Sequence, residues 1–464
     1  MSEWLANAVE GLKDFVWGPA MMVLLLGAGL FFTVGGRFMQ VAKWPDIWRQ
    51  TFGGLLRGKA KKRGGVTPFQ AVSTALASTV GTGNIVGVAA AMVLGGPGAI
   101  FWMWVSAILG MMTKYAEVVL AQIYRRPDGR GGFIGGPMYV IRDGLHSKFL
   151  AGIFAVFGLL ASFGVGNMIQ TAAIVKTVGP ITNIPDQTIG LVTMLIVGMV
   201  ILGGAKVIVK VTEKLTPIMA GIYIVAALMI IFLNIKNVPQ AFGLILKNAF
   251  RPIPAAAGFG GFLLSQGLRD GLREGLACGM FSHEAGMGSS AIAHASADTD
   301  DPVKQGFWGT MEVFVDTIVM CTLTALAILT SGVYQPQVSG GGDTPNLALD
   351  AFTGTFGSVG GALLGVSTVL FAVGAIIGWQ FYGETCCRYL FPRSEKYAVL
   401  CYRLLYIAAV FVGSTQTLAL LWDLSKILNG LMAVPNLIAL FLLSGVVFKA
   451  TKRYFRQTGF QKRE

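Results

Sequence analysis

The chain has 464 residues, of which 54% are hydrophobic and only 13% are charged. Soluble domains carry about 25% charged residues, so this composition excludes a soluble fold and indicates a polytopic membrane protein. A net charge of +13 would suggest nucleic-acid binding in a soluble protein. Here the basic residues lie between apolar spans, where they orient the chain, and we expect no nucleic-acid partner.

The apolar stretches predict about eleven transmembrane helices in one transport domain. Each has about the 17–25 residues that a bilayer core requires, or somewhat more. They lie near residues 15–36, 66–94, 97–124, 149–176, 187–205, 213–234, 262–293, 306–331, 358–386, 397–421 and 428–448. The predicted fold class is therefore an all-α polytopic membrane protein.

Charge between the spans predicts the orientation. Lys and Arg cluster in segments 37–65 and 125–148 and after residue 448, whereas segment 332–357 has none. The positive-inside rule then places the N-terminus outside and the C-terminus in the cytoplasm, and we expect a multi-pass protein of the cell (inner) membrane. The strong basic cluster follows the first span, which is the order of an uncleaved helix. The five cysteines have neither zinc nor disulfide spacing, so we expect no resident metal or cofactor.

Two glycine-broken segments interrupt otherwise apolar spans. STVGTGN at 78–84 lies in the second span and FSHEAGMGS at 281–289 in the seventh. Backbone that leaves the helix at membrane depth is tolerated where it faces protein or a polar cavity, and paired breaks in two halves are typical of transporter binding sites. The alternative is that the glycines only let helices pack closely.

The first break offers both ends of a helix to a zwitterion. A half-helix that begins near Asn84 presents free N–H groups to a carboxylate. The half-helix that ends near Thr79 leaves free carbonyls, including those of Ala77 and Val80, which suit a cation. This pattern predicts a substrate and ion site at the break.

Five motifs carry a resemblance to a known family. They are ALASTVGTGNIVGVAAA at 75–91, GMMTKYAE at 110–117, FGVGNMIQ at 163–170, FSHEAGMGSSAIAHA at 281–295 and IIGWQFYGE at 376–384. They span most of the chain and resemble the alanine or glycine:cation symporter family, which includes sodium:alanine symporters.

The resemblance implies a leucine-transporter-type fold, with five plus five spans in an inverted repeat and one extra N-terminal helix. The extra helix and a basic loop would occupy 1–65, the two repeats 66–234 and 262–448, and a basic tail 449–464. The Val-Gly-x-Gly-Asn run at 80–84 is also similar to the broken first core helix of the leucine transporter itself.

The resemblance also implies the substrate site. Thr79, Gly83 and Asn84 would meet the carboxylate and amino group of a small neutral amino acid, with a polar contact from Gln170. The aromatic walls of a small pocket, which favours alanine or glycine, would be Phe163, Phe281 and Trp379. A zwitterion in a dry site needs a few aimed dipoles in an apolar wall, which agrees with this set.

Two departures from the family pattern concern the coupling ion. The family usually reads Ser-Asn-Glu-Ala-Gly in the seventh span, where this chain has His283 before Glu284, and it usually carries hydroxyl residues where this chain has Gly374 and Ala375. Backbone carbonyls remain for sodium, so sodium coupling is the prediction. Proton coupling through His283 or Glu284 is the alternative, because histidine titrates near pH 6.5.

Further ionisable residues lie within predicted spans. Lys114 and Glu117 are three apart on the third span and are expected to pair on one helix face. Glu312 and Asp316 are four apart on the eighth span. They either bind a cation or share a proton, or they pair with an arginine such as Arg403.

Two other function classes, an enzyme and a passive channel, fit the sequence less well. The run His283-Glu284-Ala285-Gly286-Met287 begins like a zinc-protease motif but lacks the second His, so we expect no enzyme. A passive channel is the stronger competitor, but channels tend to repeat a filter by subunit symmetry. The sequence therefore predicts a secondary symporter, functional as a monomer, for a small neutral amino acid and sodium.

Overall fold

A computed structural model of the chain describes residues 11–12, 16–56, 65–129, 131–250, 266–335 and 346–458. The described part is almost entirely helical. Its one sheet pairs β1 (Arg126–Pro127) with β2 (Phe133–Ile134) in antiparallel register. Part of the basic segment 37–65, residues 57–64, lies outside the described residues.

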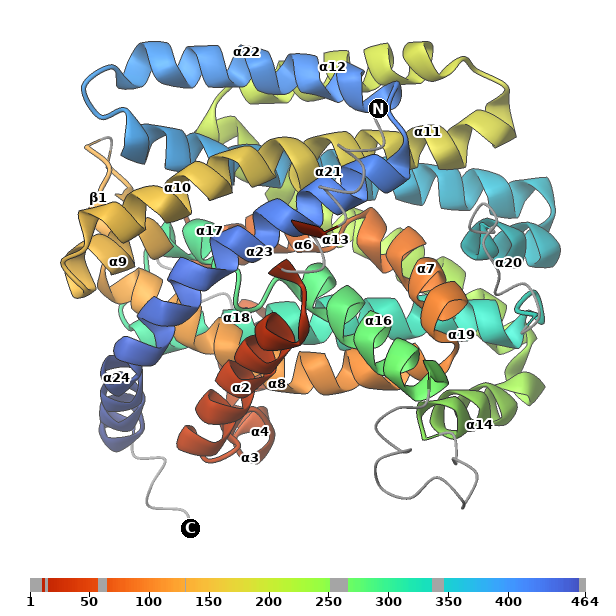
Figure 1. Cartoon of the computed structure of the whole chain (residues 1–464), viewed down its shortest axis with the longest axis horizontal. Coiled ribbons are helices and arrows are strands. Elements are labelled where there is room, and N and C mark those ends of the chain that lie inside the picture. The colour runs from red at the N-terminus through yellow and green to blue at the C-terminus, as the bar shows by residue number, and fades with distance from the viewer. Residues whose placement is uncertain are drawn as a thin grey trace.

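Several of the long helices, such as α8, α12 and α22, run roughly along the long axis of the molecule, whereas α2 and α24 run across it (Figure 1). Those before residue 250 are α2 (Pro19–Gly35), α3 (Met39–Ala42), α4 (Trp44–Gln50), α5 (Phe52–Leu56), α6 (Pro68–Thr79), η1 (Thr82–Asn84), α7 (Val86–Gly95), α8 (Gly98–Ile123), α9 (Pro137–Gly144), α10 (Lys148–Phe163), η2 (Gly164–Met168), α11 (Ile169–Thr182), α12 (Asp186–Leu202), α13 (Ala205–Leu233), η3 (Ile235–Asn237) and α14 (Val238–Ala249). Those after it are α16 (Gln266–His283), α17 (Ala291–Ala295), α18 (Pro302–Val313), η5 (Phe314–Cys321), α19 (Thr322–Thr330), α20 (Leu347–Phe356), α21 (Ser358–Leu390), α22 (Glu395–Ser414), α23 (Leu418–Leu442) and α24 (Ser444–Gln457).

Both predicted breaks are present. At about 1.5 Å per residue, α6 and α7 are each far shorter than the roughly 30 Å bilayer core, and the residues between them leave the α-helix. The second break separates α16 from α17. In Figure 1 α7 extends toward the right end of the molecule and α17 toward the left end, so the two broken helices run in opposite directions.

Seven unbroken helical stretches in the described residues are long and apolar enough to cross a membrane. They are Gly98–Ile123, Lys148–Thr182, Ala205–Leu233, Pro302–Thr330, Ser358–Leu390, Glu395–Ser414 and Leu421–Leu442. Two of them contain a π-helical segment, η2 and η5. Such π turns inside α-helices frequently mark functional sites, and both segments contact the first break, η2 through Gln170 and η5 through Asn84.

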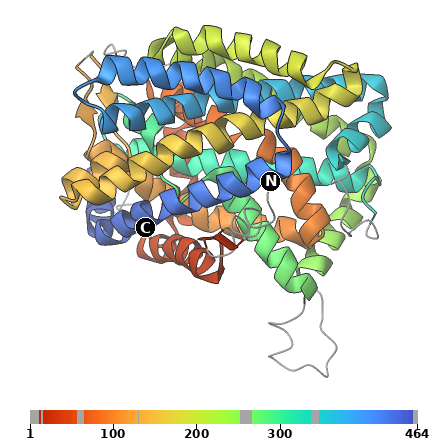
Figure 2. The same ribbon diagram turned by 45° about the horizontal axis from the view of Figure 1, so that its top comes forward.

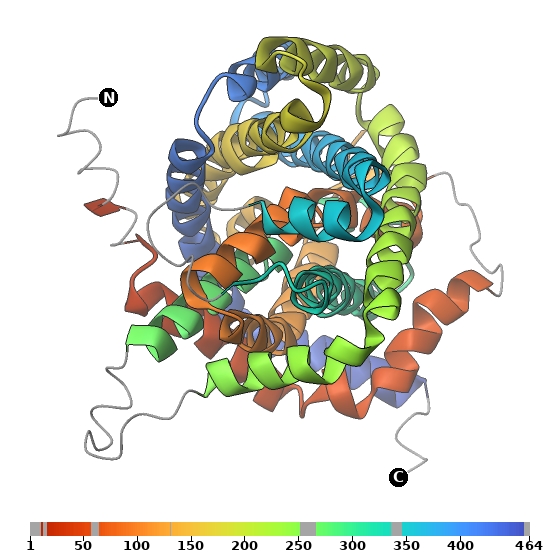
Figure 3. The same ribbon diagram turned by 90° about the vertical axis from the view of Figure 1, so that its right-hand side faces the viewer.

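The two breaks are buried by the surrounding helices: residues 281–289 are all buried, and residues 78–84 are buried except for Gly83. In Figure 3, which views the molecule from its right-hand end, α13 runs along one side and α19 lies nearer the centre. The packed pair α12 and α22 forms the outer layer at the top of Figures 1 and 2, with α10 and α11 below it. This arrangement leaves the two breaks in the interior.

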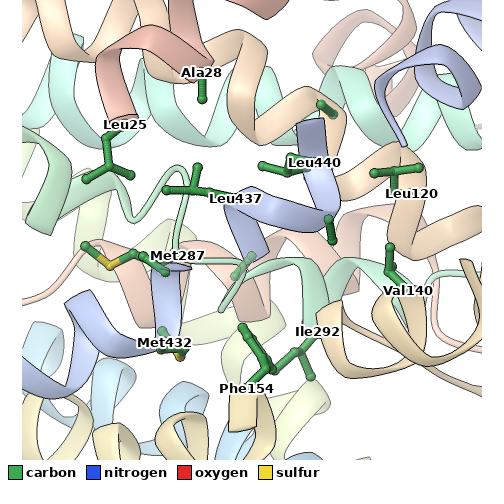
Figure 4. Close-up of a cluster of buried hydrophobic side chains, with 14 of the residues drawn as sticks. Leu25, Ala28, Leu120, Val140, Phe154, Met287, Ile292, Met432, Leu437 and Leu440 are labelled. Carbon is green, nitrogen blue, oxygen red and sulfur yellow. The ribbon is translucent and has the colours of Figure 1, made fainter. Parts of the chain in front are cut away.

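The extra helix α2 covers the second break. Figure 4 shows Leu25 and Ala28 of α2 in one buried cluster with Met287 of the broken segment and Leu437 of α23. A Cβ on Gly286 would collide with the Leu25 side chain, so α2 lies directly against the backbone of the break. Helix α2 therefore packs onto the core of the molecule.

Candidate functional site

The first break is held by an amide of α11. After α6 ends at Thr79, the backbone N–H and hydroxyl of Thr82 donate to Gln170 Oε1 at 3.2 and 2.9 Å. Gln170 Nε2 donates to the Val165 carbonyl in η2 at 3.0 Å. In this conformation Gln170, a predicted substrate contact, uses its amide to fix the break.

Asn84 joins the break to η5. Its Oδ1 accepts from the Gly81 N–H at 3.0 Å, which fixes the orientation of the amide. Its Nδ2 donates to Asp316 Oδ1 at 2.8 Å and to Ser282 Oγ at 3.2 Å. The Thr79 hydroxyl donates to the Ala75 carbonyl of its own helix. Asn84 is thus a link between the two halves of the chain.

Asp316 is a buried carboxylate surrounded by neutral polar groups. Besides Asn84, the hydroxyls of Ser282 and Thr317 donate to its Oδ2 at 2.8 and 2.7 Å. No Lys or Arg of the described residues lies within ion-pair distance of it. Burying an unpaired charge is costly, and hard cations prefer oxygen ligands. Asp316 is therefore a candidate cation ligand.

The predicted cation residues of α6 and α21 are brought together. A Cβ on Gly374 would lie 3.5 Å from the Ala77 carbonyl oxygen, and a Cβ on Gly81, beside Val80, would lie 3.4 Å from Ala375 Cβ. All five are buried. This second candidate position has only backbone oxygens from these residues, since neither Gly374 nor Ala375 has a side-chain hydroxyl.

An open cavity of about 1120 Å³ reaches the first break. Its lining includes Gly83, Phe281, Ser282 and Trp422, and Trp422 packs against Phe281 with ring centroids 4.6 Å apart. A side chain on Gly83 would meet nothing within 4 Å. The charged residues of the wall are Lys176, Asp186, Glu274, Asp423 and Lys426.

The other two predicted aromatic walls lie elsewhere. Trp379 is buried, packs on Gly166 of η2 and donates its indole N–H to Glu284 Oε1 at 3.1 Å. Phe163 packs against Tyr402 and Tyr406 of α22, with ring centroids 5.5 Å apart in both cases. Neither lines the cavity, so of the three aromatics only Phe281 reaches it.

The second break is held by Glu117 of α8. After His283 the backbone adopts positive φ at Glu284 (54°), Gly286 (95°) and Gly288 (78°), which two glycines accommodate without steric conflict. Glu117 Oε1 accepts from the N–H groups of Gly286 and Gly288 at 2.8 and 3.0 Å. Glu284 itself accepts from Ser289 Oγ and Trp379.

His283 faces α8 and not the cavity. Its Nδ1 accepts from the Ala285 N–H at 3.1 Å, and its Nε2 lies 3.3 Å from Ser106 Oγ. A nitrogen that accepts a hydrogen bond carries no proton, so this geometry suits the neutral ring with its proton on Nε2.

The remaining buried ionisable residues pair differently from the sequence expectation. Lys114 Nζ lies 3.5 Å from Glu312 Oε1 and donates to Ser290 Oγ at 2.6 Å, and His294 Nε2 lies 2.8 Å from Glu312 Oε2. The expected Lys114–Glu117 pair is therefore replaced by Lys114–Glu312. Arg403 pairs with Glu384 at 2.8 Å and with neither acidic residue of the eighth predicted span.

The sequence as a whole matches the family model described as the sodium:alanine symporter family over residues 2–464. The chain belongs to the sodium:alanine symporter family. The sodium/alanine symporter AgcS of Methanococcus maripaludis is 42% identical over 453 residues, which cover 97% of each chain. An uncharacterized transporter of Haemophilus influenzae is 41% identical over 454 residues, covering 98% of this chain and 97% of the relative.

The symporter also resembles solved transporter structures. MhsT in complex with L-phenylalanine aligns with a TM-score of 0.59 at 14% identity, covering 81% of this chain and 88% of MhsT. A Na⁺-coupled sialic acid symporter aligns with a TM-score of 0.56 at 15% identity, covering 93% and 86%. These likenesses confirm the leucine-transporter-type fold. The symporter is a secondary transporter and not an enzyme.

Sequence reasoning missed several residues of the symporter site. Thr82, Ser282 and Trp422 were not singled out, although all three contact a predicted site residue. Thr82 and Ser282 belong to the two broken motifs, so the motifs themselves were a signal. For Trp422 the sequence had no comparable signal.

Proposed function

We propose that this symporter imports alanine or glycine together with sodium by alternating access. The observation that carries the proposal is the position of Gly83: the backbone of the first break borders an open cavity at a residue without a side chain. A carboxylate can approach N–H groups there because no Cβ intervenes. The name of AgcS, a sodium/alanine symporter at 42% identity, supports this substrate and ion.

The proposed substrate position is the part of the cavity beside Gly83. Phe281 and Trp422, which also line the cavity, pack against each other and offer an apolar surface to a methyl group or a hydrogen atom. In this conformation Thr79, Asn84 and Gln170 are not among the residues that line the cavity. We infer that these residues contact the substrate only after Gln170 or Asn84 gives up its present hydrogen-bond partner and binds the substrate in its place.

Sodium has two proposed positions. One is formed by the carbonyls of Ala77 and Val80 with the adjacent backbone of Gly374 and Ala375. The other is Asp316 with Ser282 and Thr317, where a carboxylate without a cationic partner favours a monovalent cation. The second position adjoins Asn84, so an ion there would act directly on the first break.

Proton coupling is the alternative. The contacts of His283 do not favour it, because protonation of Nδ1 would break the hydrogen bond from the Ala285 N–H. Glu284 stays a candidate for a proton site, since its described partners are the neutral groups of Ser289 and Trp379.

We further propose an inner-membrane location with the N-terminus outside, on the charge pattern described above. The cavity would then open outward, because α7 follows the basic segment 37–65 and runs away from it.

The decisive experiment is uptake of labelled alanine and glycine into proteoliposomes, with sodium and proton gradients imposed separately. We expect accumulation with a sodium gradient alone. Accumulation with a proton gradient alone would favour the alternative, and equal rates without any gradient would favour a channel.

A further inference from the structure

Glu117 holds the second break with one oxygen and leaves the other without a partner. It is buried in the middle of α8. Its Oε1 accepts three hydrogen bonds, from Gly286 N, Gly288 N and, at 2.7 Å, Asn436 Nδ2. Its Oε2 is buried and has no hydrogen-bond partner. One carboxylate oxygen thus fixes the break, and the other has free lone pairs.

No cation of the described residues is paired with Glu117. Lys114, one turn earlier on α8, is engaged by Glu312 of α18 and by Ser290. Among the described residues, the other charged group near Glu117 is the carboxylate of Glu312, which adds no positive charge beside Glu117. Next to it α23 contributes the neutral Asn436. A buried carboxylate in this position is expected to bind a proton or a cation.

One face of α23 carries three polar residues between the cavity-lining residues Trp422 and Lys426 and the neighbourhood of Glu117. Ser425, Asn429 and Asn436 are spaced by four and seven residues, so they share a face of the helix. Both Ser425 and Asn429 are fully buried, yet Ser425 Oγ and both amide atoms of Asn429 have no hydrogen-bond partner. Their neighbours Trp422 and Lys426 line the cavity. Buried polar atoms without protein partners normally bind ordered water.

We propose that Glu117 is a proton-binding group of the symporter, reached from the cavity through water held along Ser425 and Asn429. A hydronium ion transfers its proton to Glu117 Oε2 and leaves as water, and no electrons change hands. The neutral carboxyl is a weaker acceptor for the N–H groups of Gly286 and Gly288, because charge-assisted hydrogen bonds are roughly twice as strong as neutral ones. Protonation therefore loosens the second break, and the ionised form tightens it.

This inference deepens the proposed function, because it assigns a regulation of the same broken helices by external pH. It does not depend on the identity of the substrate. A ligand-free test therefore separates its failure from the failure of the proposed function.

The test is infrared difference spectroscopy of the purified, ligand-free symporter after a downward pH jump. We expect a carboxyl C=O band to appear in the wild type, to be missing in Glu117→Gln and to persist in Asp350→Asn, an exposed control on α20. Asn429→Leu removes the unpartnered amide without removing a hydrogen bond. It should slow the appearance of the band several-fold with the same final amplitude.

Two outcomes would overturn the inference: a band that persists in Glu117→Gln, or an unchanged rate in Asn429→Leu. If Glu117→Gln does not fold, the rate in Asn429→Leu still decides. Failure of alanine to stabilise the wild type at any pH would count against the proposed function and leave the infrared result standing.

Discussion

Asn84 donates to Asp316 Oδ1 at 2.8 Å and to the Asp316 backbone carbonyl at 3.0 Å. The two residues are 232 positions apart, and they connect the first broken helix with the π segment of the second half. Because Gly81 fixes the other side of the same amide, any ion that changes the contacts of Asp316 also changes those of the break. If Asp316 binds sodium as proposed, this connection is the physical route from ion binding to substrate binding.

Replacing Asp316 by Asn should weaken sodium binding. The variant keeps the shape of the side chain but removes the charge that attracts the ion, and we expect the sodium concentration for half-maximal uptake to rise at least about tenfold, or about 1.4 kcal/mol. Sodium-dependent alanine uptake in proteoliposomes measures it, with Asp350→Asn as the control. An unchanged sodium dependence would assign the ion to the Ala77–Gly374 position.

Replacing Gly83 by Leu should abolish binding of alanine without preventing folding. A Cβ at this position meets nothing within 4 Å, so the side chain fits the fold but fills the adjoining part of the cavity. Expression and thermal stability should match the wild type, while uptake is lost. Gly152→Leu on α10, which also meets nothing within 4 Å, is the matched control. Normal uptake in Gly83→Leu would mean that the substrate binds elsewhere.

Alanine and glycine should stabilise the detergent-solubilised protein by mass action. At about one hundred times Kd, a ligand that binds only the native state adds about 2.7 kcal/mol. Thermal unfolding curves recorded with alanine, glycine, leucine and glutamate measure this. Leucine and glutamate should have little effect, since the proposed substrate position beside Gly83 suits a small apolar side chain next to the rings of Phe281 and Trp422. Equal stabilisation by all four would contradict a small pocket.

The breaks were predictable because their signals are local. The second predicted span is too long for one helix and carries Gly-Thr-Gly at 81–83, and the seventh carries Gly-Met-Gly at 286–288. Each break can therefore be recognised from residues within its own span. The fold followed from the same segments once they were matched with the family motifs.

The partners of the buried charges were not predictable. Lys114 and Glu117 share a helix face, yet the first pairs with Glu312 and the second with backbone 169 and 171 residues away. Which helix covers that face is a tertiary property, and the pattern of one sequence does not contain it. Phe163 shows a second limit: the π segment η2 follows it directly, and a π turn changes the direction of side chains relative to a regular helix.

Removing Lys114 should destabilise the protein strongly. In Lys114→Met the carboxylate of Glu312 stays buried without its lysine, and breaking a buried pair in this way costs about 3–5 kcal/mol. The double variant Lys114→Met/Glu312→Leu should recover most of this loss, because an apolar replacement of the whole pair is often neutral. Unfolding in a mixed-detergent titration measures both. No recovery in the double variant would indicate that the hydrogen bond from His294 to Glu312, and not the ion pair, stabilises this region.

Replacing His283 by Asn should leave the coupling ion unchanged. The amide oxygen of Asn can accept the Ala285 N–H in place of Nδ1, and the wild-type ring sits against Ser106, away from the cavity. We therefore expect the variant to require sodium for uptake and to respond to an imposed pH gradient as the wild type does.

The measurement is alanine uptake in proteoliposomes at fixed sodium over a range of external pH, with Gly152→Leu as a control for reconstitution. If the wild type accumulates alanine with a proton gradient alone and His283→Asn does not, the imidazole carries the coupling proton. The hydrogen bonds that the neutral imidazole makes in this conformation would then belong to only one step of the transport cycle.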